Sequence, residues 1–160
     1  MAIDSSKNKI KAITEFHEGE ILSITETLED SQILLYLGLT KDANPLFIQT
    51  EFAEETINDA PIVPSIMLMG IISSNISKHL PGPGWNIVNV TFNLLRNVYH
   101  GETLTFHFEI INIDELKRTM TLSVKAYDYD DERILNSVVI VELNTKEKVR
   151  DVNGSTTSDN

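Results

Sequence analysis

The strongest constraint on the fold is a long apolar segment, residues 64 to 80. Apolar side chains cover nearly all faces of a helix built over this segment, and Pro64 suits its first turn. A helix that is apolar all round in a soluble domain must be covered by other structure. Gly82, between Pro81 and Pro83, then ends the helix. The sequence therefore predicts one long, buried, central helix.

After Trp85 the apolar residues alternate with polar ones, which is typical of strands with one buried face. A further strand is expected before the helix, at residues 19 to 27. The apolar positions of the later strands are Val88, Val90, Phe92 and Leu94, then Leu104, Phe106, Phe108 and Ile110, then Met120, Leu122, Val124 and Ala126, and finally Ile134 to Leu143. One helix followed by several antiparallel strands indicates the α+β class, with the sheet wrapped around the helix.

A shorter helix is expected between the first strand and the central helix. Asp30 or Ser31 can cap it, because a short polar side chain binds the free amides of a first helical turn. Pro45 excludes helical geometry from the residue before it, so this helix must end by about Asp42.

The length of the chain, 160 residues, is enough for one domain with a proper core. We assign residues 15 to 146 to this domain and expect residues 1 to 14 to be a flexible lead-in. Residues 147 to 160 are too polar to repay the entropy of ordering and are expected to be a disordered tail.

Several features favour a cytoplasmic protein. No apolar run reaches the roughly 18 residues that span a bilayer, and the N-terminus lacks the layout of a signal peptide. The chain has no cysteine, which excludes disulfides and thiol nucleophiles. The four histidines show no metal-ligand spacing, so we expect neither a metal nor a cofactor.

The charge balance argues against nucleic-acid binding. Thirteen basic and twenty-four acidic side chains give a net charge of −11, which repels polyanions. It does not exclude one phosphorylated ligand, because a few local lysines and arginines are enough to meet a nucleotide.

Four sequence blocks resemble the MaoC-like dehydratases, a family of (R)-specific enoyl-CoA hydratases with the hot-dog fold. Together the blocks cover roughly residues 17 to 143. Residues 42–47 resemble D-x-N-P-x-H, residues 60–68 the segment P-I-V-H-G-M-L, residues 80–84 the loop after the central helix, and residues 92–104 the pattern F-x-x-P-V-x-x-G-D-x-L. The resemblance implies a single hot-dog domain, a homodimer, and an acyl thioester of coenzyme A or acyl carrier protein as the ligand.

The departures from the family pattern cluster in the site. Asp42 matches the catalytic aspartate and Asn44 the supporting asparagine, but Phe47 stands where the family has its catalytic histidine. Pro64 and Ser65 replace a His-Gly pair whose glycine amide polarises the thioester carbonyl in the family. By the same resemblance, the substrate-binding positions are Pro64, Ser65, Ile66, Gly82, Gly84 and Trp85.

Phe47 bears directly on the chemistry. Hydration of an enoyl thioester needs a group that deprotonates water, and histidine suits this task because its ordinary pKa lies near 6.5. Phenylalanine can neither orient water nor carry a proton. Asp42 alone remains as a possible base, and one missing proton-transfer partner typically costs ~10²–10⁴ in rate.

Each of these residues also has a plainer interpretation. Asp42 can be a turn residue, because aspartate binds its own backbone two residues on. Ser65 can cap the central helix, which we consider its main role, and Trp85 can be a core residue. Three functions thus remain open: a weak hydratase or dehydratase, a non-catalytic protein that binds acyl thioesters or other apolar ligands, and an acyl-CoA thioesterase that uses Asp42.

Overall fold

The computed structural model describes residues 9 to 146 of the chain. The predicted tail at residues 147–160 and most of the predicted lead-in lie outside these residues. The elements are the 3-10 turn η2 (Ile13–Glu15), β1 (Ile21–Thr27), α1 (Asp30–Thr40), the 3-10 turn η3 (Pro45–Phe47), α2 (Thr50–Glu54), α3 (Ser65–Lys78), β2 (Trp85–Leu94), β3 (Thr103–Asp114), β4 (Thr119–Tyr127) and β5 (Arg133–Leu143).

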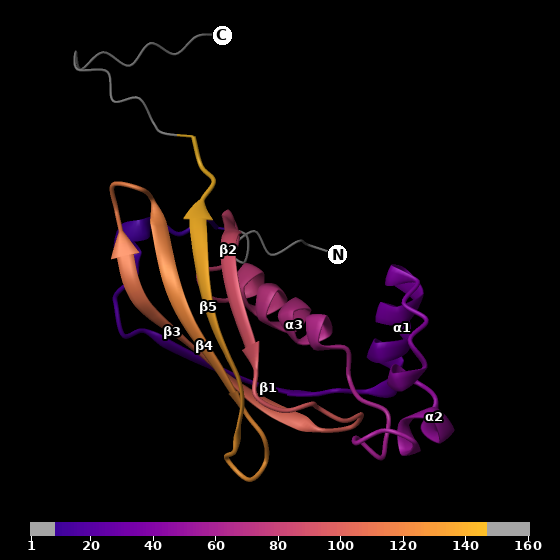
Figure 1. Ribbon diagram of the computed structural model, residues 1–160. Helices are drawn as coiled ribbons and strands as arrows, with labels where there is room; N and C mark the ends of the chain where they lie inside the picture. The colour runs from indigo at the N-terminus through magenta and orange to yellow at the C-terminus, as the bar shows by residue number, and fades with distance from the viewer. Residues whose placement is uncertain (1–8, 147–160) are drawn as a thin grey trace, which may run out of the picture.

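The five strands form one antiparallel sheet in the order β1-β3-β4-β5-β2. Figure 1 shows α3 lying against one face of the curved sheet, with α1 and α2 together to one side. The α+β class and the antiparallel sheet are therefore confirmed. Because β1 and β2 are the two ends of the strand order, each has one edge without a partner strand among the residues that the structure describes.

The core lies between α3 and the inner face of the sheet. The alternating residues of β3 and β4 are fully buried, as their period predicts; they are Leu104, Phe106, Phe108 and Ile110, and Met120, Leu122, Val124 and Ala126. Burial of one such side chain is worth about 1.5–3 kcal/mol. The buried side chains of β3 and β4 form the apolar surface on which α3 lies.

The burial of α3 is one-sided within this chain. Leu68 and Ile72 are fully buried against the sheet, whereas Ile66 is 59% exposed and Gly70 is also exposed. The prediction of a buried helix therefore holds only for the side that meets the sheet. Within residues 9–146, none of the helices combines the length and the apolar character needed to cross a bilayer.

Strand β2 departs from the predicted alternation. The pairing with β5 shifts between Ile87 and Asn89, so Ile87 packs against the core and Val88 is 50% exposed. Val90 pairs with the buried Val139 but is itself 42% exposed, because β2 is the last strand of the sheet within residues 9–146. The sequence pattern could not reveal a one-residue shift of register.

Candidate functional site

Asp42 lies just beyond the end of α1. The helix ends at Thr40, and Lys41 adopts the left-handed conformation (φ 56°) that stops it. The predicted end by Asp42 is confirmed. The predicted cap is wrong: Glu29 occupies the cap position, and Asp30 is the first residue of the helix.

Two consecutive side-chain turns follow. The Asp42 Oδ1 atom accepts a hydrogen bond of 3.1 Å from the backbone N–H of Asn44. The Asn44 Oδ1 atom accepts one of 3.1 Å from the backbone N–H of Leu46 and so caps η3. Both side chains therefore have the turn role that their residue types favour, while the second oxygen of Asp42 has no bond among the described residues.

Phe47 is the last residue of η3 and is partly buried against the hydrophobic core. The Leu46 carbonyl accepts a hydrogen bond of 3.2 Å from the Ile62 N–H. This bond places the loop that carries Asp42 and Phe47 beside the segment that leads into α3. The structure thus brings the two parts of the predicted site next to each other.

The start of α3 differs from the prediction for Ser65. Pro64 is buried at the cap position, Ser65 is the first helical residue, and no side chain caps the helix. The predicted capping role of Ser65 is therefore wrong, because Pro64 occupies the position that a cap requires. The backbone N–H groups of Ser65 and Ile66 belong to the first turn, where the helix itself offers no acceptor. Such groups can polarise a carbonyl oxygen.

The remaining predicted binding residues, Gly82, Gly84 and Trp85, follow the opposite end of α3. Trp85 is 6% exposed and meets the ring of Phe16 edge-on at 5.8 Å, so it occupies a core position. Because α3 has 14 residues, about 21 Å of helix separates this group from Ser65. The structure does not gather the six predicted binding residues at one place.

An open groove of about 550 Å³ runs between α1 and α3. Leu35 and Leu39 of α1 border it and are 74% and 85% exposed. From α3 it is lined by Ile66, Gly70, Ser74 and Lys78, among others. The sequence analysis missed this groove, although the four-residue spacing of the small residues Gly70 and Ser74 within an apolar helix was a readable signal.

The comparisons with known proteins decide the family. The model of the MaoC like domain matches residues 13–130, most of the chain.

The chain belongs to the MaoC-like domain family.

An (R)-specific enoyl-CoA hydratase from Rhodospirillum rubrum is 29% identical over 107 residues, which cover 67% of this chain and 74% of the relative. The (R)-specific enoyl-CoA hydratase of Aeromonas caviae is 22% identical over 125 residues, covering 78% and 93%. Among solved structures, R-hydratase PhaJ1 from Pseudomonas aeruginosa, in its unliganded form, superposes with a TM-score of 0.78 at 17% identity, over 92% of this chain and 96% of that one. The hot-dog fold expected from the sequence blocks is confirmed.

The histidines of this MaoC-like domain that the structure describes lie in other contacts than with Asp42. His100 is held away from it, because its Nδ1 atom lies 3.1 Å from Asp30 Oδ1. Across the described residues, no hydrogen bond joins any histidine to Asp42, and no group of three acidic or histidine side chains is arranged to hold a metal ion.

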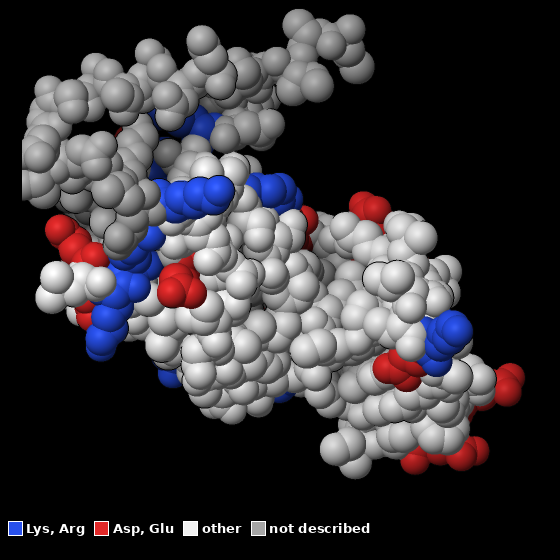
Figure 2. All heavy atoms as spheres, turned by 90° about the horizontal axis from the view of Figure 1, so that it is seen from above, with Lys and Arg blue, Asp and Glu red and all other residues white. Residues whose placement is uncertain are grey.

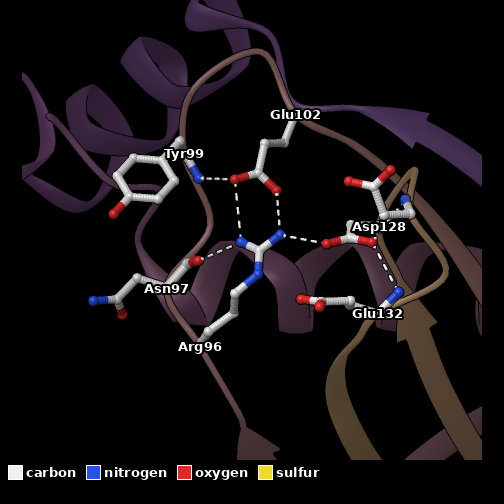
Figure 3. Close-up of polar contacts among 7 residues, drawn as sticks. Arg96, Asn97, Tyr99, Glu102, Asp128 and Glu132 are labelled. Atoms are coloured by element: carbon white, nitrogen blue, oxygen red, sulfur yellow. Dashed lines mark hydrogen bonds and ion pairs between the residues drawn. The ribbon is translucent and has the colours of Figure 1, made fainter.

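A cluster of polar side chains surrounds Arg96 in the MaoC-like domain (Figure 3). The guanidinium donates to both carboxylate oxygens of Glu102, at 3.2 and 3.0 Å, and to Asp128 at 2.8 Å. It also donates to the carbonyl of Asn97 at 2.7 Å. The cluster joins the segment after β2 to the turns before β3 and after β4. The sequence analysis did not single it out, because Asp128 lies 32 residues from Arg96.

The cluster shifts the pKa of Arg96 and that of Asp128. The hydrogen bond with Glu102 raises the pKa of Arg96, with a further contribution from Asp128 and an opposing one from burial. The hydrogen bond from Arg96 lowers the pKa of Asp128, against a smaller desolvation effect. Because these charges are mutually satisfied, we assign the cluster to stability rather than to chemistry.

Proposed function

We propose that this protein is a MaoC-like acyl-thioester hydratase or dehydratase homologue that binds acyl thioesters and has weak or lost hydratase activity. Its relatives are named (R)-specific enoyl-CoA hydratase and 3-hydroxybutyryl-CoA dehydratase, which supports a thioester as the ligand. The proposed loss of activity rests on Phe47, which lies in η3 five residues after Asp42. Its phenyl ring cannot exchange a proton with water or substrate.

The binding half of the proposal rests on the start of α3. The first-turn N–H groups of Ser65 and Ile66 are available to a thioester carbonyl, and the positive end of the helix dipole favours the charge that develops on it. The loop that carries Asp42 lies against the same segment through the bond between Leu46 and Ile62. Carbonyl recognition therefore does not require the missing histidine.

The catalytic half is incomplete for a chemical reason. Water must lose a proton as it adds to the double bond, and the α-carbon must gain one. Asp42 can serve only one of these steps at a time, and one of its oxygens is already engaged with the Asn44 N–H. Loss of one proton-transfer partner predicts a rate lower by ~10²–10⁴.

Turnover of crotonyl-CoA tests the proposal. Loss of enoyl absorbance reports hydration, release of free thiol reports thioester hydrolysis, and calorimetry with a non-reactive saturated acyl-CoA reports binding. We expect binding with at most slow hydration. Hydration at the rate of the Rhodospirillum rubrum hydratase, measured alongside, would contradict the proposal, and rapid release of thiol would indicate a thioesterase instead.

We also propose that the protein is a homodimer that joins through β2. The β2 edge exposes Val88 and Val90, and an uncovered apolar edge strand promotes pairing with another chain. Pairing two copies of β2 antiparallel about a two-fold axis would extend the sheet across both subunits.

A further inference from the structure

Strand β1 is one of the two ends of the sheet, and its outer edge has no partner strand among the described residues. The proposed homodimer joins through β2 at the other end of the sheet, so it leaves the β1 edge free. The strand has seven residues, and neither a proline nor a register shift interrupts its pairing with β3. A regular, uncovered edge of this length can accept a further strand.

The backbone groups at this edge are assigned from the hydrogen bonds to β3. The Glu20 carbonyl accepts a hydrogen bond of 3.0 Å from the Ile110 N–H. The Leu28 N–H donates one of 2.9 Å to the Glu102 carbonyl. Antiparallel strands bond through alternate residues, so the even-numbered residues of β1 bond to β3. The N–H and C=O groups of the odd-numbered residues therefore point to the open edge; these residues are Ile21, Ser23, Thr25 and Thr27.

The side chains of this strand leave the open edge uncovered. Three of them bond to the residue opposite on β3: Ser23 to His107 at 2.7 Å, Thr25 to Thr105 at 3.0 Å, and Thr27 to Thr103 at 2.8 Å. Cross-strand pairs of this kind stabilise a sheet, and they hold the side chains toward β3. The edge backbone is thus kept in strand geometry with its polar groups accessible.

The inner face of β1 has an apolar centre with a carboxylate at each end. Leu22 and Ile24 are partly buried and pack against the core. Glu20 and Glu26 flank them on the same face, about 20 Å apart along the strand. Among the described residues, neither carboxylate takes part in an ion pair.

These carboxylates oppose pairing of β1 with a second copy of itself. Two-fold pairing must match odd-numbered residues with odd-numbered ones, so the inner-face residues also meet one another. In the register centred on Ser23, Glu20 of each copy lies opposite Glu26 of the other. Shifted by one bonded pair, Glu26 lies opposite Leu22 in one direction and opposite Glu18 in the other. Like charges opposite each other are destabilising, and a carboxylate against a leucine loses hydration without compensation.

The net charge does not select the partner by itself. The chain carries −11, yet both signs occur on the face drawn in Figure 2, with a wide uncharged surface between them. Lys9 and Lys11 border a hollow that Leu22 also lines, which places positive charge near the Glu20 end of β1. Selection by charge therefore falls mainly on Glu26, at the opposite end of the strand.

Inward-pointing charges commonly do no more than protect an edge from aggregation. That explanation covers the exclusion of a second copy, but the same carboxylates attract a strand of opposite charge. We propose that the β1 edge binds an extended segment of another protein by strand addition, and that this segment carries a basic residue, two apolar residues and a second basic residue at alternate positions. In an antiparallel match the basic residues lie opposite Glu26 and Glu20. The apolar residues then lie beside Ile24 and Leu22, and the central residue exchanges backbone hydrogen bonds with Ser23.

Fluorescence anisotropy on the unmodified protein tests the proposal with the end-blocked, labelled peptide Lys-Thr-Val-Thr-Val-Thr-Lys. We expect saturable binding that weakens as the salt concentration rises. The same peptide with glutamate in place of both lysines should bind about tenfold more weakly. N-methylation of the central threonine removes the N–H that bonds to Ser23 and should abolish binding. N-methylation of the valine before it, whose N–H points away from β1, should leave binding unchanged.

Variants of the protein then locate the site. Thr25→Pro removes an edge N–H without removing a backbone bond to β3, and it should abolish peptide binding. Thr25→Ala is the matched control, because it loses the same side-chain bond to Thr105 and keeps the N–H. Glu26→Lys should weaken the lysine peptide about fivefold and strengthen the glutamate peptide. Glu115→Lys, an equal change of charge in the exposed turn after β3, should alter neither.

Three results would overturn the assignment: no binding of the lysine peptide, equal binding of both charge forms, or equal loss on methylation at either position. Sedimentation without peptide provides a fourth. A lower oligomeric state of Thr25→Pro than of Thr25→Ala would show that a second copy occupies the edge. None of these measurements involves a thioester, so the strand-addition site and the proposed function stand or fall separately.

Discussion

The carboxylate of Asp42 holds the backbone N–H of Asn44 at 3.1 Å, and Asn44 in turn caps the next 3-10 turn through Leu46. The two residues that match the aspartate and asparagine of the family motif therefore build the loop in which they lie, whether or not they also take part in chemistry. Any test of Asp42 must separate these two roles.

The substitutions Asp42→Asn and Asp42→Ala separate them. An asparagine side chain accepts the same hydrogen bond from the Asn44 N–H, so Asp42→Asn should leave the melting temperature nearly unchanged and abolish any residual hydration of crotonyl-CoA. Asp42→Ala loses the bond as well and should cost about 1 kcal/mol of stability. Glu51→Gln, an exposed change of equal charge, is the control. Residual hydration that survives Asp42→Asn would show that Asp42 is a turn residue only.

The sequence predicted those features that depend on local chemistry. The alternation in β3 and β4 and the end of α1 before Asp42 follow from neighbouring residues, and so does the Asn44-Pro45 turn. The groove beside α3 could not be predicted in this way. Its two walls come from α1 and α3. The distance between two helices depends on how each packs in the tertiary structure, which a local sequence pattern does not reveal.

The same reason explains the errors at single positions. Ser65 has the chemistry of a cap, but Pro64 before it already occupies that position in the structure. Val88 and Val90 have the period of buried residues, but their burial depends on the register shift in β2 and on what lies beyond its edge.

We predict that the protein loses stability in acid when Asp128 becomes protonated. Its pKa is lowered in the folded protein by the hydrogen bond from Arg96. A group with a lowered folded pKa contributes stability above its unfolded pKa, near 4, and loses that contribution as the pH falls through the folded value. Asp128→Asn should therefore lower the melting temperature at pH 7, and the difference from the unmodified protein should shrink below about pH 4.

Thermal unfolding followed by circular dichroism across this pH range provides the measurement. Asp130→Asn is the control, because Asp130 is exposed in the same turn and its backbone N–H, not its carboxylate, contacts Asp128. A difference between Asp128→Asn and the unmodified protein that stays constant down to the lowest pH would rule out this linkage.

The edge of β2 should control assembly. Sedimentation should show a homodimer at micromolar concentration, and Val90→Lys should shift it toward the monomer, because a charge on the paired edge would be buried in the interface. Ile21→Lys, at an exposed apolar position of the opposite edge strand β1, is the matched control. A stable monomer of the unmodified protein would contradict the proposed pairing.

Phe47 should decide catalysis. The Asp42–Asn44 and Asn44–Leu46 bonds depend on residues that the substitution leaves in place, so Phe47→His should keep the loop. It would put an imidazole at the end of η3, five residues after Asp42. An imidazole titrates near neutral pH and can take the proton from water, so hydration of crotonyl-CoA should rise by ~10²-fold or more. Adding Ser65→Gly should raise it further if the Ser65 side chain obstructs access to the first-turn N–H groups.

Phe47→Gln introduces polarity without a base near neutral pH and should not restore turnover. If Phe47→His binds a saturated acyl-CoA as the unmodified protein does and yet gains no hydration, then the loss of activity has a cause other than the missing histidine.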